Sequence, residues 1–199
     1  LPLQSGSNKI LKAMHRPYTA EKYAELIARI RRARHGIAIT TDIIVGFPGE
    51  TEDDYRQTRE LVRQIQFDNA FVFRYSLRSG TSAANIPNQI DELVKEKRNH
   101  DLLEIVNKSN RRILERLVGS EVEVLCEGLS KTNPARLMGR TRTNKIVVFP
   151  PSPRRLHDNS PAGQWAPRKS EGDELVGELV NVRIERANGF SLYGTPLPT

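Results

Sequence analysis

The chain has 199 residues, of which 37% are hydrophobic and 28% are charged, and this balance can fill one large compact core or two small ones. No apolar run is long enough to cross a bilayer, so we expect no membrane span. The single cysteine, Cys126, excludes an internal disulfide and a metal cluster held by several thiolates of this chain, and it favours a reducing, cytoplasmic compartment.

The formal net charge of +7 favours a polyanionic partner but does not establish one, because the basic residues are spread along the chain. The four histidines have no metal-ligand spacing, and no Ser-His-Asp arrangement can be proposed. We therefore assign no metal ligand, and the catalytic residues remain unknown.

The first ninety residues alternate between strand and helix patterns. Residues 1–3 suit the end of a strand. Because the sequence begins there, with Leu1 and not with methionine, we expect it to be part of a longer protein. Thr19 is an N-cap candidate, and the helix after it should stop near Arg34, before Gly36. The β-branched run at residues 37–47 suits a strand that is covered on both faces.

Thr51 and Asp54 have the spacing of a capping pair at the start of the next helix, and residues 69–76 alternate as a third strand. This order predicts a parallel sheet of β/α units. Three strands cannot close a barrel, which again indicates missing sequence before residue 1. Residues 90–118 then predict one long helix or two in series, with a buried stripe that includes Leu93, Leu102 and Val106.

After Gly119 the residue pattern changes from helical spacing to short segments of alternating apolar and polar residues. These segments predict a small antiparallel β-domain that closes into a barrel. The segment around residues 150–173 is rich in Pro and Ser, and we interpret it as a disordered loop. Its Trp165 could fold back on the barrel or stack on a base. The predicted domains are therefore residues 1–118 and residues 119–199.

Polar residues follow each of the three predicted strands of the first domain. Because the carboxyl ends of parallel strands share one edge, we expect these residues to form one binding face. Gly46 and Gly49 would let the backbone pass close to a ligand, although a tight turn explains them equally well. The predicted binding residues on this face are Gln4, Ser5, Gly46, Tyr75 and Arg78.

Asp42 lies inside the apolar strand, where a buried carboxylate needs a partner. Structural hydrogen bonding and ligand contact are both open for it. Glu50, Glu52, Asp53 and Asp54 lie at a helix start, where capping is the favoured role.

The strongest nucleic-acid signal is "GRTRTNK", residues 139–145. On a strand, Arg140 and Arg142 would project from one face at a spacing suited to successive phosphates, with Asn144 and Lys145 beside them. Solvated surface arginines are the alternative interpretation.

Several of these segments together resemble one known family. "LPLQSGS", "KAMHR", "TDIIVGFPGET", "YSLRSGTSA" and "GRTRTNK" are similar to motifs of the radical S-adenosylmethionine (SAM) methylthiotransferases, and the last resembles the branch that acts on tRNA. The resemblance covers nearly all of the chain outside the loop from Pro150 to Asp173.

The resemblance implies the fold class: the C-terminal half of a radical SAM (β/α) barrel with parallel strands, followed by a small antiparallel, OB-like barrel called the TRAM domain. It also implies N-terminal domains absent from this chain. The C-x-x-x-C-x-x-C loop that holds the radical-generating [4Fe–4S] cluster is missing, so we expect this chain alone to be inactive.

The parent enzyme would add a methylthio group to carbon 2 of an N(6)-isopentenyladenosine beside the tRNA anticodon. One SAM would give the radical that abstracts hydrogen, another would supply the methyl group, and a second [4Fe–4S] cluster would handle the sulfur. Neither cluster would be held by this chain. By the same resemblance, Arg16 and Ile44 join Gln4, Ser5, Asp42, Gly46, Tyr75 and Arg78 as residues of the SAM site.

The resemblance further implies that the anticodon stem-loop of tRNA binds the strand of Arg140 and Arg142. Two other functions remain open. A sister branch of the family methylthiolates an aspartate of a ribosomal protein, and a non-catalytic RNA-binding module would also suit two domains and a basic charge. A scaffold without either function is the least specific alternative.

Overall fold

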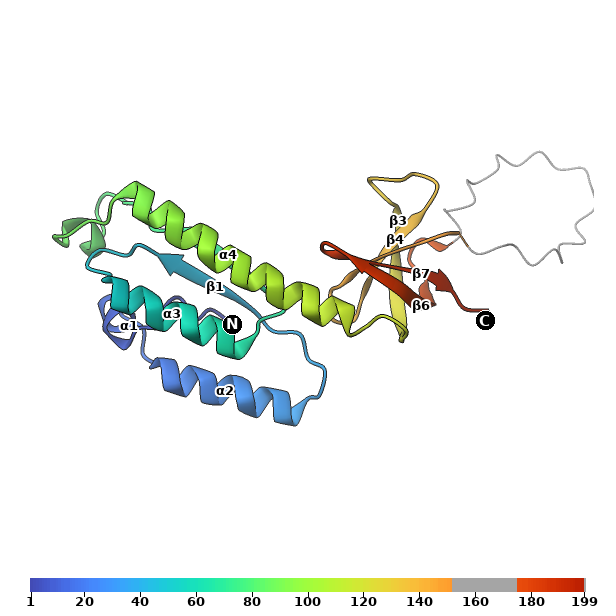
Figure 1. The fold of residues 1–199 in the computed structure, drawn as a ribbon, viewed down its shortest axis with the longest axis horizontal. Coiled ribbons are helices and arrows are strands. Elements are labelled where there is room, and N and C mark those ends of the chain that lie inside the picture. Colours follow the sequence, from blue (N-terminus) through green and yellow to red (C-terminus); the bar gives the residue numbers. More distant parts are fainter. Residues whose placement is uncertain (152–174, 199) are drawn as a thin grey trace, which may run out of the picture. The chain divides into compact units, whose positions relative to one another are not determined.

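The structure is a computed structural model, and it describes residues 1–151 and 175–198. The chain divides into two compact units, Leu1–Asn110 and Arg111–Thr199, which are treated separately below (Figure 1). The predicted loop around residues 150–173, with Trp165, lies almost wholly outside the described residues.

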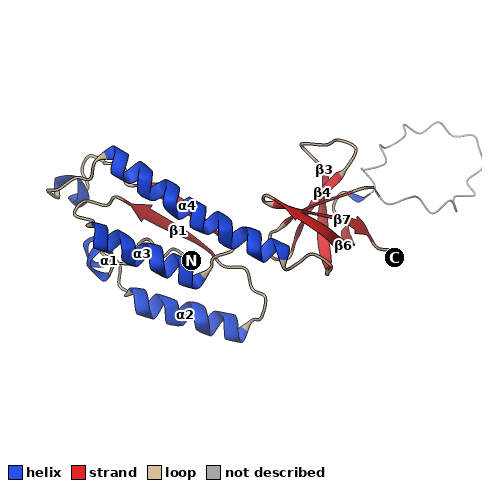
Figure 2. Ribbon diagram, in the orientation of Figure 1, coloured by secondary structure: helices blue, strands red, loops and turns tan. Residues whose placement is uncertain are grey.

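The first unit is built from β/α repeats, as the alternation of patterns predicted (Figure 2). Strands β1 and β2 pair in parallel, from Thr40 beside Asn69 to Val45 beside Arg74. The segment before them adds a short third edge, because Gln4 bridges to Ile43 in parallel. The elements are α1 (Asn8–Ala13), α2 (Ala20–Ala33), β1 (Thr40–Val45), α3 (Glu52–Ile65), β2 (Asn69–Arg74), the short 3-10 helix η1 (Ser82–Asn85) and α4 (Glu92–Glu115).

Local capping signals set the helix starts. Thr19 accepts a hydrogen bond from the Lys22 amide at the start of α2, and Thr51 forms a reciprocal capping box with Asp54 at the start of α3, so both predictions are confirmed. Helix α1 was not predicted, since its N-cap Ser7 lies in a small polar run that is typical of a loop.

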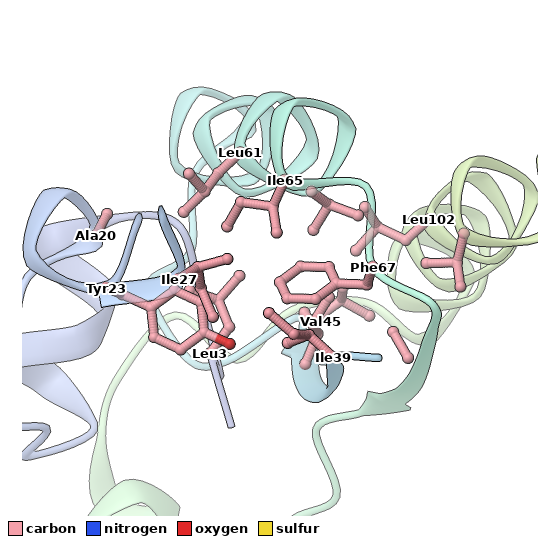
Figure 3. Close-up of a cluster of buried hydrophobic side chains, with 14 of the residues drawn as sticks. Leu3, Ala20, Tyr23, Ile27, Ile39, Val45, Leu61, Ile65, Phe67 and Leu102 are labelled. Atoms are coloured by element: carbon pink, nitrogen blue, oxygen red, sulfur yellow. The ribbon is translucent and has the colours of Figure 1, made fainter. Parts of the chain in front are cut away.

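Helices cover one face of the sheet and fill the core of the unit (Figure 3). Tyr23 and Ile27 of α2, Leu61 of α3 and Leu102 of α4 converge on the side of β1 that carries Val45. Burying such side chains contributes about 1.5–3 kcal/mol each, so this face carries the stability of the unit.

The expectation that β1 is covered on both faces is wrong in this structure. Thr41, Ile43 and Val45 are buried, while the residues between them are only partly buried. On β2, Phe71 and Phe73 are more than half exposed, and their rings stack with centroids 6.4 Å apart. The described helices cover the opposite face, so alternation replaces the continuous burial of a two-sided sheet.

Of the two predicted arrangements, one long helix or two in series, the structure has one long helix, but its buried stripe differs from the prediction. Leu102 and Val106 are buried, whereas Leu93 is 75% exposed. Leu93 lies in the first turn of α4. In the first two turns of the helix, Lys95 and Arg98 are buried instead.

The second unit is a closed barrel in the order β3-β4-β5-β7-β6 (Figure 2). Closure confirms the predicted barrel, but β5 and β7 pair in parallel, so the barrel is not wholly antiparallel. Gly139 allows β3 and β4 to approach, since a Cβ there would lie 2.2 Å from the Leu125 carbonyl oxygen. The strands are β3 (Glu121–Leu129), β4 (Leu137–Thr141), β5 (Ile146–Phe149), β6 (Leu179–Asn188) and β7 (Ser191–Pro196).

Cys126 lies in β3 with 1% of its surface exposed, in the barrel core, as a small apolar residue would. Burial raises the pKa of its thiol. Within residues 1–151 and 175–198, no helix has the length and apolar character needed to span a membrane.

Candidate functional site

The three strand ends of the first unit lie side by side, as their sequence order predicted. The Gln4 amide donates to the Asp42 carbonyl at 2.8 Å, and the Ile44 amide donates to the Gln4 carbonyl at 2.9 Å. On the other side, the Tyr75 amide donates to the Val45 carbonyl at 2.9 Å. We call this edge the rim; it brings Gln4, Gly46 and Tyr75 to one side of the unit.

The turn after β1 is held by buried groups of the protein itself. The Gly46 amide donates to both carboxylate oxygens of Glu50, at 3.1 and 3.2 Å. Gly46 has φ +72°, and a Cβ on it would come within 2.3 Å of Cγ of Lys95. The left-handed backbone agrees with the tight turn that was one of the two interpretations of Gly46, and the missing side chain makes room for Lys95.

A buried ion pair fixes Glu50 in turn. Arg98 of α4 donates from Nη1 to Glu50 Oε1 at 2.6 Å, and only 7% and 2% of the two side chains are exposed. Nη2 reaches Glu52 at 3.0 Å, and the guanidinium lies 5.2 Å from the Tyr55 ring centroid. Burial raises the pKa of Glu50, and this effect outweighs the lowering by the Gly46 amide and Arg98.

Tyr75 closes the rim on the side of β2. Its ring meets Phe47 edge-on at 5.3 Å, and Nζ of Lys95 lies 5.7 Å from the ring centroid. Nζ also donates to the Tyr75 carbonyl at 3.2 Å. The buried hydroxyl of Tyr75 has no hydrogen-bond partner in the described part of the chain, so it is a polar group that a bound ligand could satisfy.

Gln4 has a left-handed backbone with φ +65°, and its side-chain oxygen accepts from Nη2 of Arg16 at 3.2 Å. The structure thus brings these two predicted residues together. Ser5 is buried, and its hydroxyl accepts from the Ser7 amide at 3.1 Å and lies 3.2 Å from the Thr58 hydroxyl. The Ser5 side chain is therefore already engaged in joining the first segment to α3.

Asp42 and Ile44 lie on the sheet face that the helices leave open, and both are partly exposed. Asp42 is therefore not the fully buried carboxylate that its strand suggested. Arg78 is exposed in the segment after β2, where its carbonyl accepts from the Thr81 hydroxyl at 2.8 Å.

Asp54 belongs to a structural network beside the rim. It accepts from the Ser7 hydroxyl and from Nζ of Lys9, each at 2.7 Å, in addition to Thr51. Burial alone would raise the pKa of Asp54, but the hydrogen bonds from Lys9, Thr51 and Ser7 hold it well below its usual range. This confirms the capping role predicted for this carboxylate.

Sequence reasoning missed Glu50, Lys95 and Arg98 as residues that build the rim. The many charges of residues 90–118 are typical of a solvated helix face, and most of them are exposed. The available signal was the spacing of Lys95 and Arg98, which places them on one side of a helix, but exposed pairs have the same spacing.

The second unit carries the predicted arginines on its outer surface. Arg140 donates from Nε to Glu127 at 3.3 Å and from Nη1 to Asn144 at 3.0 Å. Arg142 donates from Nε to Glu123 at 2.6 Å. Strand β4 ends at Thr141, so Arg142 lies in the following turn and not on the strand as expected.

Asn144 lies in the same turn with φ +60°. Lys145 is buried, with 7% of its surface exposed, so it differs from Arg142, which is exposed, and from Arg140, which is half-buried. The arginines, and not Lys145, form the accessible part of this surface.

No group of three His, Cys, Asp or Glu side chains suited to a metal ion occurs in residues 1–151 and 175–198. The chain's one cysteine cannot supply the thiolates of an iron–sulfur cluster, so its residues do not fit that group. SAM fits better, since the rim offers the unpaired Tyr75 hydroxyl and the Gln4 and Arg16 side chains.

Comparison with known families divides the chain in the same way. Residues 1–62 match the radical SAM superfamily, and residues 115–162 match the TRAM domain. Both matches agree with the resemblance that the sequence motifs indicated.

Curated relatives extend the similarity to the whole chain. A tRNA-2-methylthio-N(6)-dimethylallyladenosine synthase of Akkermansia muciniphila is 52% identical over 198 residues, which are 100% of this chain and 39% of the relative. Proteins of the same name from Moorella thermoacetica and Methylacidiphilum infernorum are 49% and 46% identical, over 98% and 99% of this chain.

The chain therefore spans about 39% of the length of the curated relatives it matches. The resemblance to the radical SAM methylthiotransferases is confirmed. Among solved structures, the apo form of Mycoplasma genitalium RNase R matches 56% of this chain over 20% of its own length, with 9% sequence identity and a TM-score of 0.28. A structural similarity this low supports no conclusion about fold or function.

Proposed function

We propose that this chain is part of a radical SAM methylthiotransferase that modifies tRNA, adding a methylthio group to carbon 2 of an N(6)-isopentenyladenosine beside the anticodon. The proposal rests mainly on identity of about half the residues with relatives that are named for this product, over aligned stretches that include both units. Their names favour the tRNA branch over the branch that acts on a ribosomal protein.

The two units would divide the work. Residues 1–118 would form the later part of the SAM barrel, and residues 119–199 the TRAM domain, which the matches at residues 1–62 and 115–162 support. The tRNA substrate makes the cytoplasm the expected compartment.

The rim would bind the adenosyl cofactor. Gln4, Gly46 and Tyr75 lie together there, and the predicted set also includes Ser5, Arg16, Asp42, Ile44 and Arg78. When bound, SAM supplies the radical chemistry and the methyl group. The residues of this chain would bind and orient it, and the buried Tyr75 hydroxyl would gain the partner that it lacks.

The [4Fe–4S] clusters would be held by other segments of the complete enzyme, because this chain has one cysteine and it is buried in the barrel. The chain alone would then be inactive. The exposed Arg140 and Arg142 would contact phosphates of the anticodon stem-loop, where each charge adds salt-dependent affinity.

Complementation tests the proposal directly. The complete gene is introduced into a bacterium that lacks its own methylthiotransferase, and nucleosides from its tRNA are separated by mass. A nucleoside heavier by one methylthio group on isopentenyladenosine is the expected product. Unmodified isopentenyladenosine, despite expression of the soluble enzyme, would refute it; a methylthiolated ribosomal protein instead would favour the sister branch.

A further inference from the structure

Helix α4 carries two buried cations in its first two turns, and both contact residues of the rim. Lys95 and Arg98 are three residues apart, and 8% and 6% of their surfaces are exposed. Cations are rarely buried to this extent unless they are paired. Both side chains come from a helix, yet each contacts a turn of the rim, either directly or through one other residue.

Lys95 joins the two neighbouring turns directly. Its aliphatic stem occupies the space beside Gly46, where a Cβ would lie 2.3 Å from Cγ, and its Nζ donates to the Tyr75 carbonyl at 3.2 Å. One side chain therefore contacts both the end of β1 and the end of β2.

Arg98 acts on the same turn through a second residue. It holds Glu50 at 2.6 Å, and Glu50 accepts the Gly46 amide through both oxygens. The orientation of the Gly46 peptide thus depends on Arg98, and a charged pair this well buried cannot exchange its partners for water at low cost.

We propose that Lys95 and Arg98 are positioning residues for the adenosyl cofactor, which they serve by holding the Gly46 turn and Tyr75 in the binding geometry. This inference rests on the function proposed above, which places SAM at the rim. A binding site that buried side chains already hold in place loses little conformational entropy when the ligand binds. Loosening such a site therefore weakens affinity, even though no direct contact with the ligand is removed.

A role in positioning the cofactor can be distinguished from a role in stability alone, because α4 makes another polar contact with α3 that can be removed by itself. Asp101 accepts from the Tyr55 hydroxyl at 2.6 Å and from Nε of Arg59 at 2.7 Å. This contact also joins α4 to α3, but none of its hydrogen bonds reaches a strand end. Asp101→Asn is therefore the matched control.

The experiment measures SAM binding by equilibrium dialysis to the complete, cluster-loaded enzyme, together with the midpoint of thermal unfolding. Lys95→Met keeps the stem beside Gly46 and removes the ammonium group. We expect it to raise the Kd for SAM about tenfold, whereas Asp101→Asn lowers the unfolding midpoint and changes the Kd less than about twofold. Arg98→Lys keeps a charge beside Glu50 and should raise the Kd by a smaller factor of about three.

An unchanged Kd in both Lys95→Met and Arg98→Lys would overturn the inference while leaving the proposed function intact. Equal weakening by Asp101→Asn would also overturn it, since the effect would then follow from loss of helix packing in general. If the wild-type enzyme binds no SAM, the proposed function fails and the inference fails with it.

Discussion

Each of the two units contains an ion pair between an arginine and a glutamate, but the pair is buried in the first unit and largely exposed in the second. In the first unit, Arg98 and Glu50 are 7% and 2% exposed and make one fixed set of contacts. In the second, Arg142 and Glu123 meet at 2.6 Å while 79% and 35% exposed. A buried pair holds its surroundings in place, whereas an exposed pair can exchange its partner for a phosphate.

The largest expected difference between the two settings is in stability. Arg98→Met leaves the Glu50 carboxylate buried without its cation, so we expect the free energy of unfolding to fall by about 3–5 kcal/mol. Arg142→Met should lower it by less than about 1 kcal/mol. Urea unfolding of the complete protein measures both values, and similar losses in the two variants would break the comparison.

Binding of RNA should show the reverse order. Arg140→Ala with Arg142→Ala is expected to weaken tRNA binding, and the slope of log affinity against log salt should fall by about 1.5, because two phosphate contacts are lost. The matched control is Arg56→Ala with Arg63→Ala, which removes two exposed, paired arginines from α3. A salt slope unchanged in the first variant would rule out the proposed contact.

Asp54 should make the stability of the first unit depend on pH. Its pKa is lowered in the folded state, so its contribution is fully present above the ordinary aspartate value of about 3.9 and is lost as pH falls through the folded value. Asp54→Asn should cost about 1 kcal/mol at pH 7, and the difference from wild type should shrink in acid. Measuring the free energy of unfolding of both proteins at a series of pH values tests this prediction. A difference between wild type and Asp54→Asn that stays constant as the solution becomes strongly acidic would contradict it.

The smallest expected effect concerns the carboxylates that face the two exposed arginines. Glu123→Gln with Glu127→Gln removes negative charge near the incoming phosphates while keeping the shape of the barrel surface. We expect tRNA affinity to rise about two- to threefold, with stability changed by less than about 1 kcal/mol. Weaker binding would show that the glutamates orient the arginines more than they compete for them.

Local patterns in the sequence predicted much of this architecture. Thr19 and Thr51 marked helix starts because a cap depends on residues within one helical turn. The order of strands and helices predicted the parallel sheet, and parallel strand ends must share an edge, so the rim followed from order alone. The closed barrel of the second unit was also predicted, from its short alternating strands, but not its five strands.

Other features depended on contacts between distant residues. The parallel pairing of β5 with β7 and the exposure of Phe71 have no local signature. The sequence shows Gly46 and Lys95 but not the contact between them. A side chain at position 46 would collide with Lys95, and this explains why a glycine is needed there.

The sequence by itself determined the elements, their order and the family resemblance, because propensity, capping and motif spacing act over a few residues. Only the tertiary structure decided which charges are buried. Arg98 meets Glu50 across 48 positions, and whether an arginine there is solvated or holds a turn depends on which helix packs against which strand end. The exposed arginines of the barrel have the same chemistry, and burial alone separates the two roles.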